Sequence, residues 1–145
     1  MIRLEKSLQE KVILNYFREK YADFPKGKVS KTESPDFLLE ISPKKRIGIE
    51  LTGMYKRSKT FVRRSLQNSL LNIIRKKEVK LKIYKKKKFE LYWLIIISDC
   101  LSELFPYNFR NKLQNTPFSS LFDKVFVFDL FEGEVFDLQL IDDNY

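Results

Sequence analysis

The sequence ESPDFLLEI-SPKKR-IGIELT, residues 33–52, decides the fold of this chain. Two apolar stretches of strand length flank a turn-forming Pro-Lys-Lys sequence, which predicts a β-hairpin. Asp36 opens the first strand, and Glu50 closes the second. Two carboxylates at one end of a hairpin suit a hard divalent cation better than they suit a protein core, so the pair is a candidate metal site.

Side-chain alternation predicts the register of this hairpin. In each stretch the apolar residues at odd-numbered positions share one face, and the two faces match when odd-numbered residues oppose one another. A three-residue turn at Pro43-Lys44-Lys45 gives this pairing, sets Asp36 opposite Thr52, and makes Glu50 the diagonal neighbour of Asp36. Diagonal Cβ atoms lie about 7 Å apart, which one metal ion and two carboxylate arms can bridge. The alternative is that both carboxylates are exposed on a solvated strand face.

The sequence Pro35-Asp36, followed after thirteen residues by Glu50-Leu51-Thr52, resembles the signature of the PD-(D/E)XK nuclease superfamily. The resemblance implies an α/β fold of the restriction-endonuclease-like type, with a mixed central sheet flanked by helices. It also implies Mg²⁺ or Mn²⁺ held by Asp36, Glu50 and the backbone carbonyl of Leu51. The activity that it implies is hydrolysis of nucleic acid.

The chain departs from this signature at position 52, where the superfamily has a lysine and this chain has Thr52. Divergent members also lack the lysine there, and some bring in a basic residue from elsewhere. Lys56, Lys59 or Arg63 is expected to take its place in stabilising charge on the phosphate. Of these, Lys56 and Lys59 are the candidate catalytic residues, and Arg63 is also a candidate contact to nucleic acid.

A helix is predicted before the hairpin, from Leu4 to Tyr21. Glu10 lies within it. The resembled superfamily often takes one more metal-binding carboxylate from this first helix, and Glu10 is the candidate here; the alternative is a solvated helix face. The expected apolar stripe of this helix consists of Leu4, Leu8, Val12, Ile13, Tyr16 and Phe17.

A second helix is predicted from Ser58 or Thr60 to about Lys80. Gln67 on this helix is a candidate contact to nucleic acid, because some branches of the resembled superfamily place a glutamine there. The block Lys85-Lys86-Lys87-Lys88 that follows is a candidate for lining a phosphate backbone. The alternative for Gln67 is an ordinary basic surface helix, and the alternative for the lysine block is a solvated loop. The expected buried stripe consists of Phe61, Val62, Leu66, Leu70, Ile73 and Ile74.

The rest of the chain predicts three more strands. Phe89 to Ser98 is almost continuously apolar, as in a central strand covered on both faces. A short helix at Asn108 to Gln114 precedes two strands, Val125 to Leu130 and Val135 to Ile141. We expect this last pair to complete the edge of the sheet rather than to carry chemistry.

The length and the net charge of the chain limit which classes of protein it can belong to. The 145 residues are expected to form one domain, large enough to bury a core of its own. Lysine and arginine number 28 against 19 acidic residues, and the net charge of +9 favours a polyanionic partner such as DNA or RNA. No apolar run reaches transmembrane length and charged residues interrupt the start, so we expect no membrane partner, no signal peptide and a cytoplasmic location. The sequence also leaves open whether the chain forms a homodimer.

Missing residue types exclude several chemistries. The chain has no histidine, which excludes Ser-His-Asp triads and every histidine general base. Its single cysteine, Cys100, can form neither an internal disulfide nor a Cys-cluster zinc site, and we expect it to pack as a small hydrophobe. Catalysis must therefore use carboxylates, lysine, arginine, tyrosine, or a metal ion held by oxygen ligands.

The leading hypothesis is thus metal-dependent cleavage of nucleic acid phosphodiesters, with Asp36 and Glu50 at the metal ion. Two other classes stay open. One is a nuclease-fold protein that binds nucleic acid without cleaving it, which Thr52 favours. The other is a toxin or antitoxin of a small defence system, which suits a basic chain of this size. The sequence does not distinguish DNA from RNA as the partner.

Overall fold

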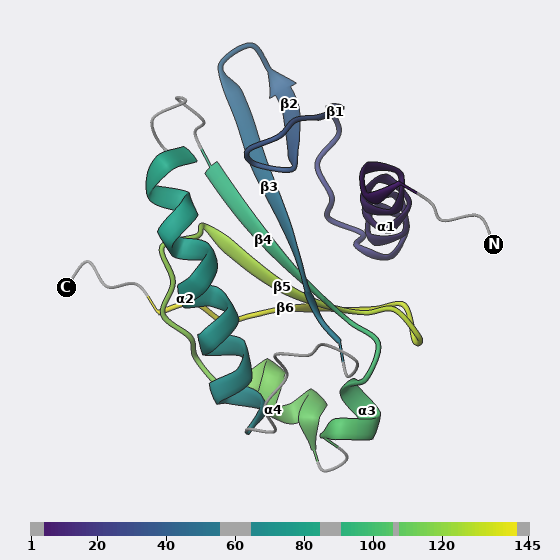
Figure 1. Ribbon diagram of the computed structural model, residues 1–145, viewed down its shortest axis with the longest axis vertical. Helices are drawn as coiled ribbons and strands as arrows, with labels where there is room; N and C mark the ends of the chain where they lie inside the picture. The colour runs from purple at the N-terminus through teal and green to yellow at the C-terminus, as the bar shows by residue number, and fades with distance from the viewer. Residues whose placement is uncertain (1–4, 56–64, 85–90, 106–107, 142–145) are drawn as a thin grey trace.

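The computed structural model describes residues 5–55, 65–84, 91–105 and 108–141 of the chain. These residues form an α/β fold in which helices flank a six-stranded mixed sheet (Figure 1). In chain order the elements are α1 (Lys6–Lys20), β1 (Lys28–Lys31), β2 (Phe37–Ser42), β3 (Lys45–Met54), α2 (Leu66–Tyr84), β4 (Leu91–Ser98), α3 (Leu101–Leu104), α4 (Phe109–Asn115), β5 (Lys124–Asp129) and β6 (Glu134–Asp137).

The strands are arranged in the sheet in the order of the chain, from β1 to β6. The first three pair antiparallel, β3, β4 and β5 pair parallel, and β6 returns antiparallel to β5. A parallel pair needs a crossover connection, and α2 supplies it between β3 and β4. The crossover brings α2 back across the sheet, which lets its side chains reach β3.

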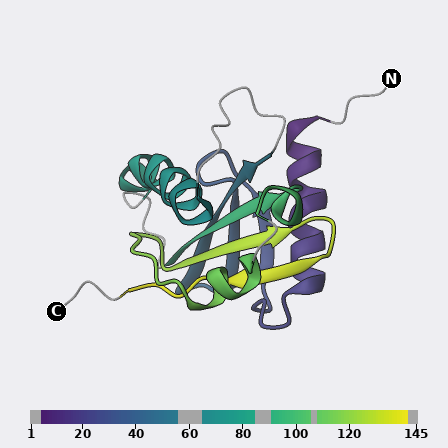
Figure 2. The ribbon, with the colours of Figure 1, turned by 90° about the horizontal axis from the view of Figure 1, so that it is seen from below.

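Two apolar layers enclose the sheet. One layer, under α1, contains Leu14 and Phe17 together with odd-numbered residues of β2, β3 and β4. The other layer, under α2, α3 and α4, contains the even-numbered residues 92, 94 and 96 of β4. Figure 2 shows α1 and α2 on opposite sides of the sheet. Because β4 contributes to both layers, the predicted central strand is confirmed.

The first helix is confirmed as α1, but part of its predicted apolar stripe is wrong. Leu8 is 44% exposed and Val12 is 55% exposed. The buried residue at the centre of the helix contact is Phe17, which packs edge-on against Phe126 and Phe128 of β5 with ring centroids 5.2 and 5.5 Å away. These aromatic partners are remote in sequence, and they decide which side of α1 faces the sheet.

The second helix is confirmed as α2, and it continues beyond the predicted end to Tyr84. The predicted start of this helix and the first two residues of its stripe fall within 56–64, outside the described residues. No helix in the described part of the chain is long and apolar enough to cross a membrane. Three residues of the predicted stripe are fully or almost fully buried, namely Leu66, Leu70 and Ile74.

Sequence patterns do not predict β1. Its sequence Lys-Val-Ser-Lys is short and polar, and the strand lies at the edge of the sheet, where it pairs with β2. At the other edge β6 ends at Asp137, earlier than predicted, and Leu140 makes an isolated bridge to Phe118 instead. Cys100 is buried, as expected for a small hydrophobe.

In the hairpin, odd-numbered residues face odd-numbered residues as predicted, but the pairs of opposing residues differ from the predicted ones. Odd-numbered residues oppose one another, and Phe37 pairs with Ile49. The predicted three-residue turn is wrong, because Ser42 pairs with Lys45 and only two residues form the turn. A bulge between Glu40 and Ser42 absorbs the extra residue, so the faces still match. The shift by two residues pairs Phe37 with Ile49 instead of Leu51, so the predicted pairing of Asp36 with Thr52 is wrong.

Candidate functional site

A cavity of about 430 Å³ lies beside the C-terminal half of β3, where residues of both α1 and α2 reach it. We call it the carboxylate cavity, because Glu10, Asp36 and Glu50 line it together with Leu51. Ligands commonly bind at the carboxyl ends of parallel strands, and β3 and β4 both end here. The four residues nominated for a metal ion therefore line one cavity.

Asp36 is held at this cavity by backbone contacts. Its Oδ2 accepts a hydrogen bond from the backbone N–H of Leu51 at 2.8 Å, and its carbonyl accepts one from the N–H of Thr32 at 2.9 Å. Gly48 lets Pro35 lie close to β3, since a Cβ at position 48 would be 2.8 Å from Cγ of Pro35. The Pro-Asp pair is thereby packed against the strand that carries the second carboxylate.

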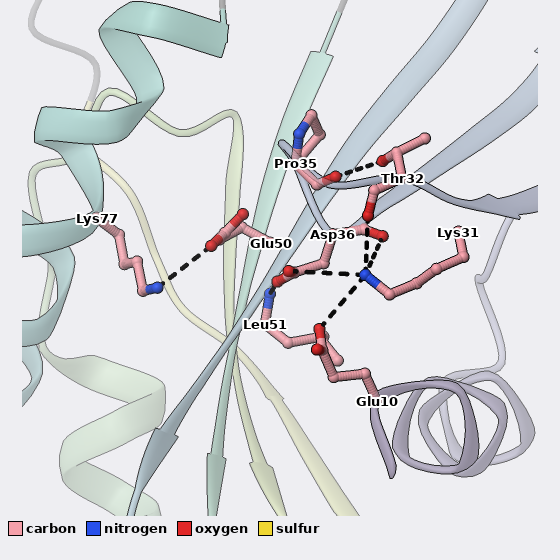
Figure 3. A network of polar contacts seen from close by, with 8 residues as sticks. All are labelled: Glu10, Lys31, Thr32, Pro35, Asp36, Glu50, Leu51 and Lys77. Carbon is pink, nitrogen blue, oxygen red and sulfur yellow. Dashed lines mark hydrogen bonds and ion pairs between the residues drawn. The ribbon is translucent and has the colours of Figure 1, made fainter. Parts of the chain in front are cut away.

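A lysine from β1 joins Asp36 to α1 (Figure 3). The Nζ of Lys31 lies 3.8 Å from Oε2 of Glu10 and 4.0 Å from Oδ1 of Asp36. It also donates hydrogen bonds to the carbonyls of Thr32 at 2.8 Å and Asp36 at 3.0 Å. Sequence reasoning missed this residue because β1 itself carries no strand pattern.

Burial and the neighbouring carboxylate of Asp36 both act on the pKa of Glu10. Burial raises the pKa of Glu10, and the charge of Asp36 and a hydrogen bond with Asp36 raise it further. The charges of Lys31 and Lys6 act in the opposite direction and lower it. This half of the cavity therefore favours an added cation or a proton.

Glu50 approaches the cavity from the opposite face of the sheet. Even-numbered residues of β3 face α2, and the Nζ of Lys77 lies 3.2 Å from Oε1 of Glu50 (Figure 3). Glu50 is 5% exposed, so this ion pair is largely removed from solvent. The Glu50 carboxylate is thus balanced by a cation from α2, and the Asp36 carboxylate by one from β1.

The sequence does carry a signal for Lys77. The buried stripe of α2 includes Ile74 and Leu81, and a helical repeat places position 77 on the same stripe between them. A lysine at such a position must find a partner under the helix, and Glu50 is that partner. Lys80, one turn along, also lines the carboxylate cavity.

The residues that line the cavity offer carboxylate and carbonyl oxygens, and these are the ligand atoms that a hard cation such as Mg²⁺ prefers. Among the described residues, no three histidine, cysteine or acidic side chains are grouped closely enough to hold a metal ion. Glu10 and Asp36 lie together, while Glu50 is turned toward Lys77. A metal ion shared by all three would require the Glu50–Lys77 pair to open.

Other predicted site residues lie elsewhere. Gln67 is exposed and lines a separate cavity of about 200 Å³ with residues of α4, away from Asp36 and Glu50. Thr52 lines the carboxylate cavity, so a lysine at this position would have reached it. The candidates at 56, 59, 63 and 85–88 lie outside the described residues, namely Lys56, Lys59, Arg63, Lys85, Lys86, Lys87 and Lys88.

One aromatic residue completes the wall. Tyr55 lines the carboxylate cavity, and its ring lies so close to Gly53 that a Cβ there would collide with it. Burial raises the pKa of Tyr55, and the charge of Asp99 raises it further. The phenol therefore stays protonated near neutral pH and can donate a hydrogen bond but not act as a base.

Comparisons with protein-family models, with curated proteins and with solved structures find no match for this chain. The chemistry of the carboxylate cavity therefore follows from its own residues. Carboxylate oxygens can bind a cation, ammonium groups can bind a phosphate, and the chain has no histidine to act as a base. This combination suits a phosphate ester better than it suits an acyl substrate.

Proposed function

We propose that this chain is a metal-dependent nuclease of the restriction-endonuclease-like fold that hydrolyses phosphodiesters. The observation that carries the proposal is one cavity lined by Glu10, Asp36, Glu50 and Leu51, the residues that the nuclease signature nominates. The order helix, hairpin, helix, strand in α1, β2–β3, α2 and β4 supports it, because the resembled superfamily has this order.

Each carboxylate has a distinct part in this proposal. Glu10 and Asp36 would hold the metal ion, since they lie on the side of the cavity where a cation is most favoured. When bound, Mg²⁺ or Mn²⁺ would activate a water molecule and offset charge on the phosphate. The negative charge of Glu50 would stay paired with Lys77 until the metal ion and the phosphodiester bind in the cavity.

Lys77 is our candidate for the role of the lysine that position 52 lacks. Its ammonium reaches Glu50 from α2, while Thr52 lines the same cavity from β3. An ammonium at this place can stabilise negative charge that builds on a phosphate during hydrolysis. Lys80 lines the cavity one turn further along α2 and would bind the phosphate backbone.

The charge distribution supports nucleic acid as the substrate. Lys6 on α1 and Lys80 on α2 both line the cavity, so its wall carries exposed ammonium groups from both helices. The whole chain has a net charge of +9, which attracts a polyanion over a longer range. A phosphodiester entering the cavity would therefore be neutralised from both sides.

A second candidate function is binding of nucleic acid without cleavage. The observation that favours it is that Asp36 and Glu50 each already have a lysine as ion-pair partner, while position 52 is threonine. Internal ion pairs of this kind can balance the carboxylates without a metal ion. Affinity for nucleic acid would then be the same with Mg²⁺ and with EDTA.

Cleavage of labelled single- and double-stranded DNA and RNA in Mg²⁺, Mn²⁺ or EDTA separates the two functions. We expect products with either metal ion and none with EDTA. Asp36→Asn should abolish them, whereas Glu19→Gln, the matched change at an exposed glutamate of α1, should leave them unchanged. A parent chain that binds these substrates and leaves all of them intact would support the binding protein instead.

A further inference from the structure

The ammonium of Lys31 lies in a setting made of oxygen atoms. Two backbone carbonyls, of Thr32 and Asp36, accept its hydrogen bonds, and the carboxylates of Glu10 and Asp36 lie within 4.0 Å. These oxygens come from α1 and from the segment between β1 and β2. A ring of oxygen atoms around one positive charge is also what a hard metal cation takes.

Lys31 is unlike an ordinary surface lysine. Its side chain is only 23% exposed, and its Nζ lies 5.0 Å from the ring centroid of Phe37, which is itself buried. Lys28, at the other end of β1, is exposed. Ordering a long side chain costs conformational entropy, so Lys31 is held where it is by its contacts. Those contacts are the acidic half of the carboxylate cavity.

We propose that Lys31 is the resident cation of this acidic half, and that a divalent metal ion binds there by exchange with its ammonium. The proposal rests on the metal site of the proposed function, because Glu10 and Asp36 are the shared oxygen donors. Two cations at the same carboxylates would repel each other strongly in a partly buried site. The space between Glu10 and Asp36 therefore holds either the ammonium or the metal ion.

Exchange has two measurable consequences. Without metal, Lys31 offsets the repulsion between Glu10 and Asp36, so its loss should destabilise the fold. With metal, the ammonium is a competitor, so its loss should tighten metal binding. An affinity gain of about tenfold corresponds to one hydrogen bond to a charged group that no longer has to be broken.

The test is titration of the purified chain with Mn²⁺, followed by calorimetry, for the parent, Lys31→Met and Lys28→Met. Lys28→Met removes the same charge from the same strand, so it measures the general effect of charge. We expect Lys31→Met to bind Mn²⁺ about tenfold more tightly than Lys28→Met does. Its melting temperature in EDTA should fall below that of Lys28→Met, and added Mn²⁺ should restore it.

A second test uses the parent chain, so it does not depend on whether a variant folds. The Nζ resonance of Lys31, assigned by comparison with Lys31→Arg, should shift on titration with Mg²⁺, while that of Lys28 should not. An unmoved Lys31 resonance, or equal Mn²⁺ affinity in Lys31→Met and Lys28→Met, overturns the exchange. If Asp36→Asn still weakens Mn²⁺ binding in that case, the metal site of the proposed function stands. If Asp36→Asn binds Mn²⁺ like the parent, the metal site and the exchange both fail.

Discussion

Two buried glutamates, Glu50 and Glu78, each pair with a basic residue of α2 but differ in their other surroundings. Glu50 is 5% exposed and Glu78 is 7% exposed. Glu78 accepts hydrogen bonds from Arg75 Nη1 at 2.7 Å, from the N–H of Leu121 at 2.6 Å and from the hydroxyl of Ser120 at 3.2 Å. Glu50 pairs with an ammonium and lines the carboxylate cavity.

Burial alone therefore does not distinguish a candidate site carboxylate from a structural one. Glu78 ties α2 to the segment before β5 through the N–H of Leu121 and the hydroxyl of Ser120, and it pairs with Arg75 within the helix. It does not line the carboxylate cavity. Lys77 and Glu78 are neighbours in sequence, yet one turns to Glu50 and the other to Leu121. Access to the carboxylate cavity distinguishes the candidate site from the structural one.

Among the lysines that line the carboxylate cavity, the largest effect is expected from Lys77, beside Glu50. Lys77→Met should lower the cleavage rate about 10²-fold, the lower end for groups that act directly in such chemistry. Lys76→Met, the change at an exposed neighbour on α2, serves as the control. Rates are measured per folded molecule with saturating Mg²⁺. Equal rates for both variants would remove Lys77 from the proposed role.

The structural glutamate should act on stability instead. Glu78→Ala leaves the N–H of Leu121 without its acceptor and breaks the pair with Arg75, at a cost of about 3 kcal/mol. The free energy of unfolding in urea measures this cost, with exposed Glu132→Ala as the control. Cleavage per folded molecule should not change. A Glu78→Ala chain as stable as the parent would contradict the structural role.

A smaller effect is expected at position 52. Thr52→Lys places an ammonium in the carboxylate cavity, but Lys77 already supplies one, so the rate should change less than about threefold. In the Lys77→Met background the same substitution should restore much of the lost rate. A double variant as slow as Lys77→Met would show that position 52 cannot replace the helix lysine in this chain.

The smallest effect is a dependence of stability on pH. The pKa of Glu10 is raised above the ordinary value of 4.5, so its contribution to stability is complete below that value and is lost as pH rises through the raised pKa. Glu10→Gln mimics the protonated form. Urea unfolding in EDTA should therefore show Glu10→Gln gaining stability relative to the parent as pH rises above 4.5. If the difference in stability between Glu10→Gln and the parent stays constant as pH rises, the raised pKa of Glu10 is contradicted.

Much of the fold around Glu50 follows from local sequence. The alternation in β2 and β3 predicts which residues face α1, and the continuous apolar run of β4 predicts a central strand. The spacing between Asp36 and Glu50 predicts that one metal ion can bridge the two carboxylates. Both line the carboxylate cavity, but Glu50 faces α2 and pairs with Lys77, so this bridge stays a prediction. These features depend on neighbours in the chain or on one short turn.

Features that depend on remote contacts could not be predicted. The bulge near Ile41 changes the register of the hairpin, and the partners of Phe17 lie more than a hundred residues away in β5. Lys31 reaches the carboxylates of Glu10 and Asp36 from an edge strand that has no strand pattern. Lys77 carries a signal within α2, but the identity of its partner depends on how the helix crosses the sheet.

The most direct measurement compares Glu50→Gln with Glu78→Gln in cleavage of labelled DNA and RNA with Mg²⁺. Both changes remove one buried negative charge and keep the size of the side chain. We predict that Glu50→Gln folds and does not cleave, and that Glu78→Gln is less stable but cleaves at the parent rate per folded molecule. Cleavage by Glu50→Gln at the parent rate, or cleavage by the parent in EDTA, would contradict the assignment of the carboxylate cavity as a metal-dependent active site.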